Sequence, residues 1–298
     1  MIHRAGLGIA CALAAAALYG LIPNFSRAAF ENGVPPVEST FSRTSVIAIA
    51  FAILAILRGE SFALPRAALG AFATQAVSTL VISVGYLAAG QFIPVGLAVI
   101  IFFSFPLIIL LASPFIEGRR PGLLRFAISL FAFAGLAVAV GPSFEGLDPR
   151  GLALAAAAAA GAVLQFFSGR AISRHLTPTV FGSLVHLAIW PATLLVALAV
   201  SGGVLQILPG GTATAPGYAF LAGLAGLYTA AYLVQMLSLR FAPASTVAPF
   251  FNLEPMVTTG VAAVLLGERL AINQYVGGGM VLAALLASSL TKDKAETL

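Results

Sequence analysis

Two apolar stretches of this chain carry polar side chains at the spacing of one helix face. Their members follow one another at steps of three or four residues: Gln75, Thr79, Ser83 and Tyr86, and then Tyr228, Tyr232 and Gln235. Amides and hydroxyls donate and accept hydrogen bonds, so these stripes suit the binding of a polar solute. They equally suit hydrogen bonds that join one membrane helix to another. The residue types leave both interpretations open.

The two stripes are related by an internal repeat. A shift of 149 residues carries Thr79 onto Tyr228, and it aligns segment 91–120 with segment 240–269 without a gap. Stripes that obey one symmetry favour a shared, water-accessible pocket between the two halves over scattered helix contacts.

Further candidates lie in other apolar stretches: Tyr19, Gln165, His186, Trp190 and Asn252. His186 and Trp190 are four residues apart and therefore share a helix face. A membrane histidine can titrate near neutral pH, although it is more often a hydrogen-bonded packing residue. We count all five, together with the two stripes, as candidate substrate-binding residues.

Glu254 and Arg43 are charged residues within apolar stretches. A carboxylate at the bilayer centre costs at least ~2.5 kcal/mol, so Glu254 should face the protein interior. It suits a proton or cation coupling site, a partner for a substrate ammonium group, or a structural donor beside Pro255, which cannot donate to the carbonyl of Phe251. Arg43 is expected to pair with Glu38 or with backbone groups at a packing seam.

The elements that must position these residues are membrane helices. Of the 298 residues, 60% are hydrophobic and 8% are charged, against about 25% charged in a soluble domain. Lipid must therefore cover much of the surface. Ten stretches approach the roughly 20 apolar residues that span a bilayer: 5–28, 37–57, 67–88, 94–113, 123–140, 151–172, 179–200, 217–239, 243–266 and 272–290.

The basic residues predict the orientation of these spans. With a cytoplasmic N-terminus, 11 of the 15 lysines and arginines lie in inside segments, 3 lie in outside loops, and Arg43 lies within a span. The positive-inside rule then places both termini in the cytoplasm of a bacterial-type plasma membrane. The net charge of +5 does not indicate a nucleic-acid partner, because no basic cluster exceeds a few residues.

Five spans per half require the two halves to sit upside down relative to each other. The predicted fold class is an all-α polytopic membrane protein, with ten transmembrane helices as two inverted five-helix repeats around a central cavity. The repeats cover residues 1–142 and 143–298 of one membrane domain. Many transporters build two alternating gates from such a repeat.

The second half carries motifs that resemble a known family. Asn252-Leu253-Glu254-Pro255, followed by Gly267-Glu268-Arg269-Leu270, resembles the EamA branch of the drug/metabolite transporter superfamily, as does Pro35-Pro36 followed by Arg43. The first half departs from this pattern, since Gly118-Arg119 replaces the Gly-Glu pair. We expect Glu268 at the outer membrane surface, where it favours the N-terminus of the tenth helix.

The resemblance implies a secondary transporter that exports or exchanges small metabolites through a pocket between the halves. Amino acids are the expected substrates, and an aromatic amino acid exporter is one such family member. The resemblance implies a small-molecule substrate and surrounding lipid, with no cofactor, metal or nucleic acid. The small-residue row Gly279, Ala283 and Ala287 fits either a scaffold helix or a homodimer surface.

Two other function classes remain as alternatives. A passive channel would need a ring of hydrophilic side chains along a pore, whereas the polar residues here gather near mid-depth. An intramembrane enzyme would need a reactive cluster, and the sequence holds neither H-E-x-x-H nor G-x-S-x-G. We therefore expect no enzyme activity.

Overall fold

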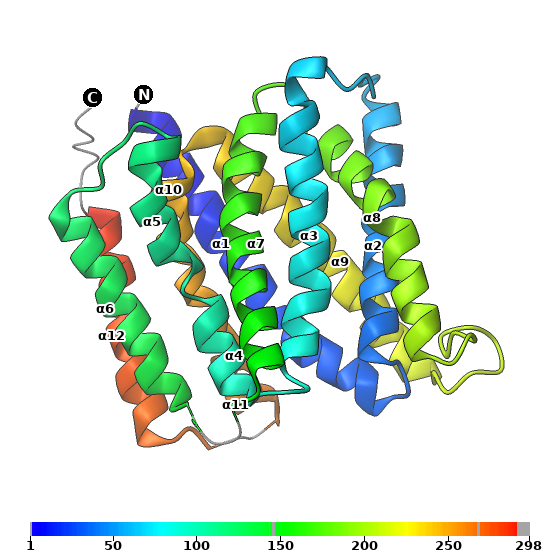
Figure 1. Ribbon diagram of the computed structural model, residues 1–298. Helices are drawn as coiled ribbons and strands as arrows, with labels where there is room; N and C mark the ends of the chain where they lie inside the picture. Colours follow the sequence, from blue (N-terminus) through cyan, green and yellow to red (C-terminus); the bar gives the residue numbers. More distant parts are fainter. Residues whose placement is uncertain (1, 143, 145–146, 267–268, 291–298) are drawn as a thin grey trace.

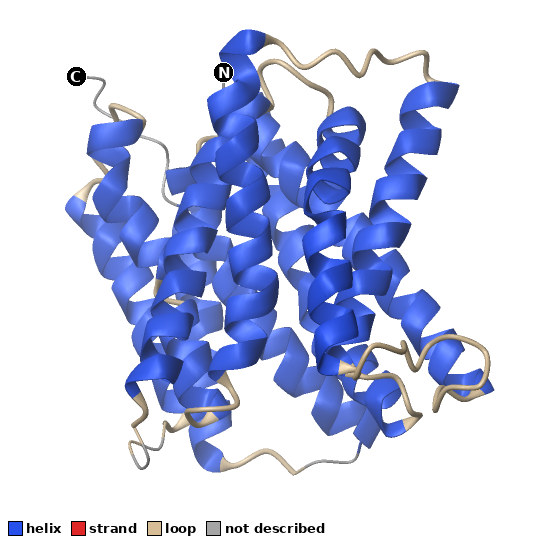
Figure 2. Ribbon diagram, turned by 45° about the vertical axis from the view of Figure 1, so that its right-hand side comes forward, coloured by secondary structure: helices blue, strands red, loops and turns tan. Residues whose placement is uncertain are grey.

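The computed structural model describes residues 2–142, 144, 147–266 and 269–290. Every regular element among these residues is helical (Figure 2). Eight spans in this described part are long and apolar enough to cross a membrane. They are α1 (Ile2–Glu31), α2 (Pro36–Leu57), η1 (Arg66–Ala68) with α3 (Leu69–Ala89), α4 (Val95–Phe102) with α5 (Phe105–Ile116), α6 (Leu123–Val140), α7 (Pro149–Ile172), α8 (Pro178–Val200) and α9 (Ala215–Phe241).

The expected ninth span is not one continuous helix. It consists of α10 (Ala244–Val247), η2 (Ala248–Asn252) and α11 (Leu253–Leu266). The fourth span is also broken, at Phe103 and Ser104. Prolines explain both breaks, because Pro106 and Pro255 have no N–H to donate to the carbonyl four residues earlier.

The expectation of ten long spans therefore holds only in part. The last helix, α12 (Ile272–Leu290), occupies the tenth position but begins with polar Asn273 and Gln274. The expected boundary between the halves falls at residue 143, which lies outside the described residues, as does Glu268. That boundary and the role assigned to Glu268 stay predictions.

The helices pack in pairs that the repeat relates. α1 makes its most extensive contacts with α9, and its repeat counterpart α7 does so with α3. α2 pairs with α8 at one end of the molecule, and α6 pairs with α12 at the other (Figure 1). Counterparts run in opposite directions, since α1 begins at the top of Figure 1 and α7 begins at the bottom.

The α2–α8 pair is held at one end by a buried carboxylate. Glu38 is 0% exposed and accepts hydrogen bonds from the hydroxyl of Ser201 and, at 2.9 Å each, from the backbone N–H groups of Gln206 and Ile207. These donors occupy both oxygens of Glu38. The expectation that Arg43 pairs with Glu38 is therefore wrong.

A second carboxylate joins the same helices at the opposite end. Glu60, just after α2, accepts from Thr177 at 2.7 Å and from Thr179 at 2.5 Å, at the start of α8. Because hydrogen bonds to a carboxylate join the two helices at both ends, the α2–α8 pair fixes the position of the side chains that it directs inward.

The α6–α12 pair depends on small residues. A Cβ added at Gly277 would lie 2.3 Å from the carbonyl oxygen of Gly135, so only glycine allows these backbones to approach so closely. A Cβ added at Gly279 would meet no atom within 4 Å, so this glycine does not lie in the contact. The row that begins at Gly279 therefore lies on another face of α12, and its use as a homodimer surface stays a prediction.

Candidate functional site

Four polar side chains from four helices form a hydrogen-bonded chain inside the bundle. The Tyr19 hydroxyl on α1 donates to Gln235 Oε1 on α9 at 2.7 Å. Gln235 Nε2 donates to Gln165 Oε1 on α7 at 3.4 Å, and Gln165 Nε2 donates to Thr79 Oγ1 on α3 at 3.1 Å. The chain crosses between the halves twice, so it joins the two predicted stripes through α7.

A second set of polar groups, which we call the dry group, is fully enclosed. Gln75, Tyr232 and His186 are each 0% exposed. Gln75 accepts from Ser168 Oγ at 2.6 Å and donates to the Tyr232 hydroxyl at 3.4 Å. The His186 ring stands edge-on to Tyr232, and His186 Nε2 lies 3.3 Å from the Tyr228 hydroxyl. These contacts satisfy the buried polar atoms, as packing between helices requires.

A continuous series of rings, here the aromatic belt, runs through the interior. Consecutive ring centroids lie 4.8 to 6.4 Å apart, within the range of favourable aromatic pairs. In order, the rings are Tyr86, Phe102, Phe105, Phe166, Phe251, Tyr19 and Tyr228. Phe102 and Phe251 occupy equivalent repeat positions beside the two helix breaks, so the repeat itself places one belt ring in each half.

Arg43 and Glu254 lie at different parts of this belt. The Arg43 guanidinium carbon is 4.5 Å from the Tyr228 ring centroid. Glu254 lies in the first turn of α11, and the Tyr19 hydroxyl is within electrostatic range of both charges. Tyr86 is within range of Glu254. Across the described ranges, neither charge has a salt-bridge partner within 4.0 Å.

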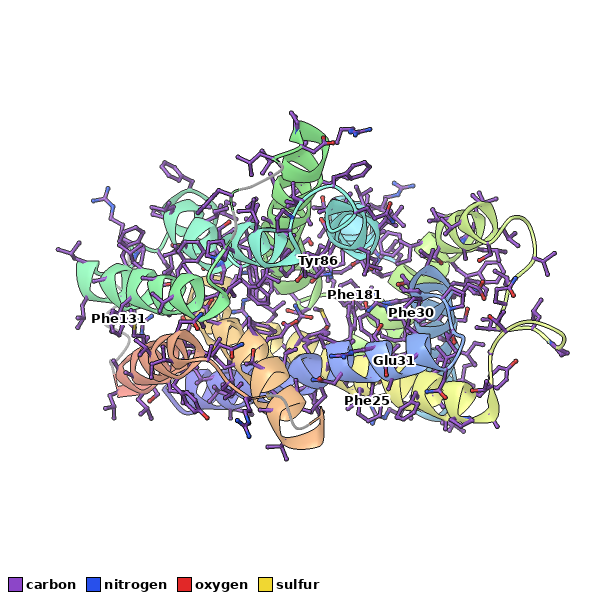
Figure 3. The ribbon with its side chains drawn as sticks, turned by 90° about the horizontal axis from the view of Figure 1, so that it is seen from below. Phe25, Phe30, Glu31, Tyr86, Phe131 and Phe181 are labelled. Atoms are coloured by element: carbon purple, nitrogen blue, oxygen red, sulfur yellow. The ribbon has the colours of Figure 1, made fainter. Side chains whose placement is uncertain are left out.

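We infer that these side chains border a space inside the bundle, here called the hollow, from their partial exposure. Tyr19, Tyr86, Arg43 and Glu254 lie among packed helices yet all remain partly exposed. Viewed along the helices, Tyr86 lies on the inner side of α3, toward the centre of the molecule (Figure 3). A polar and aromatic lining of this kind is typical of a small-molecule site.

The structural interpretation of Glu254 finds no support in its surroundings. Pro255 lies in the first turn of α11, so the bond that it cannot make falls at the helix break and not within a continuous helix. Within the described part of the chain, no hydrogen bond joins the Glu254 carboxyl to the carbonyl of Phe251 or to any other group.

Three of the predicted site residues are placed differently. Asn252 is 1% exposed in η2, where its amide donates to the carbonyl of Pro249 at 3.1 Å. Ser83 is 7% exposed, beyond the hydrogen-bonded chain on α3. Trp190 is 36% exposed on α8, and its Nε1 donates to Ser45 Oγ at 2.9 Å. The fold does not bring Trp190 to the interior group.

The sequence stripes did not predict the belt phenylalanines or the role of Ser168. Phe102 and Phe251 carried a usable signal, because the 149-residue shift relates them. Phe105 and Phe166 carried none, since a phenylalanine in an apolar helix is ordinary there.

Comparison with known proteins agrees with this architecture. The family model described as EamA-like transporter family matches residues 6–141 and again 149–290. No curated protein matches the chain. One solved structure, described only as "Crystal structure of protein", superposes with a TM-score of 0.79 at 16% identity, covering 95% of this chain and 98% of that one. That likeness shows a shared fold. Because the family model covers both halves, the chain belongs to the EamA-like transporter family.

Proposed function

We propose that this protein is a secondary transporter that exports or exchanges small metabolites, foremost amino acids, across a bacterial-type plasma membrane. Family membership makes it a membrane transporter of small solutes. The finer claims rest on the hollow between the two halves and on the polar and aromatic residues that face it.

One observation carries alternating access: the symmetric packing of the repeat. α1 packs on α9 as α7 packs on α3, and the helix breaks at Ser104 and Leu253 are equivalent under the 149-residue shift. Two arrangements related by exchange of the halves are then close in energy, which is what opening first to one side and then to the other requires.

Counterflow in proteoliposomes tests the transport function. Vesicles preloaded with unlabelled L-phenylalanine, L-leucine or L-lysine receive a trace of the labelled amino acid outside. A carrier gives transient accumulation that saturates with concentration, because each labelled molecule exchanges for an unlabelled one. Uptake that rises linearly with concentration and does not depend on the preloaded amino acid would indicate a passive channel instead.

Cysteine labelling tests the proposed orientation. Val204, in the loop after α8, is 64% exposed, and exposed Arg120 lies between α5 and α6. In a Cys11→Ala background, an impermeant thiol reagent should label Val204→Cys in intact cells and Arg120→Cys only after permeabilisation. Labelling of both from outside would contradict cytoplasmic termini.

The candidate residues divide by position within this proposal. Tyr19, Tyr86, Gln165, Arg43 and Glu254 are partly exposed and are the proposed contacts of the solute. The buried members hold the helices that carry these contacts: Gln75, Thr79, Ser83, His186, Tyr228, Tyr232, Gln235 and Asn252. A proton-coupling role for Glu254 would predict that Glu254→Gln removes the pH dependence of net flux while exchange survives.

A further inference from the structure

The turn that connects α9 to α10 is held by side chains of two other helices. On its first side, Arg170 of α7 donates to the carbonyl oxygens of Leu239 and Arg240, at 2.6 and 2.8 Å. These carbonyls lie in the last turn of α9, where no N–H of the same helix is left to donate to them. A guanidinium therefore supplies the donors that this helix end lacks.

Glu117, just after α5, holds the second side of the turn. One of its oxygens accepts from the N–H of Ala244 at 2.8 Å, and the other accepts from the N–H and the hydroxyl of Ser245 at 3.3 and 2.5 Å. Hydrogen bonds to a carboxylate are stronger than those between neutral groups. We call Glu117, Arg170 and the segment 239–245 that they hold the clasp.

The clasp joins two sets of helices at one end of the bundle. α5 and α3 both pack on α7, whereas α9 and α10 both pack on α1. Arg170 and Glu117 come from the first set, lie within electrostatic range of each other, and hold a turn of the second set. This is the end where α1 begins (Figure 1), which is the cytoplasmic end in the proposed orientation.

The repeat places an equivalent turn at the opposite end of the molecule. Turn 91–94, between α3 and α4, is related to turn 240–243 by the 149-residue shift. Each turn packs on a glycine near the start of a long helix. A Cβ added at Gly8 of α1 would lie 2.5 Å from turn 240–243, and one added at Gly151 of α7 would lie 2.7 Å from turn 91–94. The close packing of the two turns is therefore symmetric.

The polar groups of the clasp do not obey this symmetry. The 149-residue shift carries Glu117 onto Leu266, whose side chain cannot accept a hydrogen bond, and it relates Ser245 to Gly96, which has no hydroxyl. The second turn thus lacks the counterparts of both side chains that meet at the start of α10. The sequence gives the two ends of the molecule closures of unequal strength.

We propose that the clasp keeps the cytoplasmic gate closed: Glu117 and Arg170 hold the α9–α10 turn while the transporter is closed to the cytoplasm, and they release it when the transporter opens there. Because the outer turn lacks equivalents of Glu117 and Ser245, the carrier without solute favours the state that is closed to the cytoplasm. This inference rests on the proposed transport function, since a gate acts only in a carrier that opens to two sides in turn. It goes further by naming the residues that set the balance between the two states.

Distances between spin labels on the full chain in proteoliposomes test this proposal. In a Cys11→Ala background, the inner pair is Arg120→Cys with Arg240→Cys, at exposed positions after α5 and at the end of α9. The substitution at Arg240 keeps the backbone carbonyl that the clasp uses. The outer pair is Gln91→Cys with Phe30→Cys, at exposed positions near the ends of α3 and α1. The parent should give mainly the short inner distance and the long outer distance.

Glu117→Gln should lengthen the inner distance and shorten the outer distance, and so raise the ratio of the cytoplasm-open to the cytoplasm-closed state about tenfold, because a neutral amide accepts these hydrogen bonds more weakly than a carboxylate. Arg170→Gln should act in the same direction. Ser245→Ala, which removes one hydroxyl only, should act so to a smaller extent and serves if a stronger variant fails to fold. The matched control is Glu60→Gln. Glu60 also accepts from hydroxyls near the end of a helix, but within the α2–α8 pair, so both distances should stay those of the parent.

Two results would overturn the role of the clasp. An inner distance that lengthens or broadens while the outer distance stays constant would show that the variants only loosen the turn. Distances like those of the parent in Glu117→Gln, Arg170→Gln and Ser245→Ala would show that the clasp does not set the balance between the states.

Counterflow of L-phenylalanine, L-leucine and L-lysine in the same vesicles separates the two proposals. Saturable counterflow by the parent, together with parent-like distances in every clasp variant, would leave the transport function and remove the gate. Opposite changes of the inner and outer distances in the variants, with no counterflow of any of the three amino acids by the parent, would leave the gate and remove the proposed transport of amino acids.

Discussion

The fourth and ninth spans break at equivalent positions but present different surfaces to the interior. In the fourth span, Phe105 follows the break, is 3% exposed and packs on Phe166 with centroids 5.3 Å apart. In the ninth span, the equivalent residue is Glu254, which is partly exposed to the hollow. The prolines one residue later keep the backbone break in both halves. The repeat therefore preserves the break, while the side chain at one position decides which half carries the charge.

The same contrast divides the polar residues. The dry group, with Gln75, Tyr232 and His186 fully buried, satisfies its hydrogen bonds internally. Tyr19 and Glu254 border the hollow, and Glu254 keeps a free carboxyl among the described residues. We expect substitutions in the first set to reduce stability and substitutions in the second to change solute handling.

Phe105→Glu should have the largest effect on stability. It removes a ring packed in the aromatic belt and buries a carboxylate, at a combined cost of about 5 kcal/mol or more. Glu254→Gln, at the equivalent position, should change the unfolding free energy by less than about 1 kcal/mol, because its site is already polar and partly exposed. Denaturant unfolding in detergent measures both. Similar unfolding midpoints for Phe105→Glu and Glu254→Gln would contradict the difference in burial between the two positions.

Tyr232→Ala should come next, at about 3–4 kcal/mol. The ring is 0% exposed and packs against Phe51, Phe181 and His186, so its loss leaves a cavity. Tyr275→Ala on α12 is the control, because Tyr275 is 62% exposed. If Tyr232→Ala has the folded yield and unfolding midpoint of the control, the Tyr232 ring does not contribute to stability as a member of the dry group should.

Gln75→Leu should cost about 1–2 kcal/mol. The change keeps the side-chain volume but takes away the acceptor of Ser168 and the donor to Tyr232. Gln91→Leu, in the exposed turn after α3, is the matched substitution. We expect the unfolding midpoint of Gln75→Leu to fall clearly below that of Gln91→Leu, with little change in solute affinity. A changed solute affinity with an unchanged midpoint would instead place Gln75 in the hollow.

Tyr19→Phe should have the smallest effect on stability, below about 1 kcal/mol. It deletes the 2.7 Å hydrogen bond to Gln235 but keeps the belt ring. Because Tyr19 is within electrostatic range of both Arg43 and Glu254, KM for counterflow should rise severalfold while the midpoint stays near that of the parent. The Tyr218 hydroxyl donates to the carbonyl of Ile207. Tyr218→Phe is therefore the control for loss of a tyrosine hydroxyl elsewhere in the protein. An unchanged KM would separate Tyr19 from the solute.

Much of the architecture follows from the sequence alone. Apolar length predicts the spans, because the bilayer sets one thickness for all of them. The 149-residue shift and the motif around Glu254 indicate the family, which the family model confirms over both halves. The stripes at Gln75–Tyr86 and Tyr228–Gln235 come from helix periodicity, and their residues do join through hydrogen bonds.

Tertiary packing decided which of these residues are enclosed and which are reached by solvent. Periodicity places Gln75 and Tyr86 on one face of α3, but only the neighbours of that face bury Gln75 and leave Tyr86 partly open. Tertiary packing also prevents an Arg43–Glu38 pair, because backbone N–H groups of the loop after α8 donate to the Glu38 carboxylate. A sequence specifies local direction through short-range sterics, whereas burial and charge pairing depend on segments far apart in the chain.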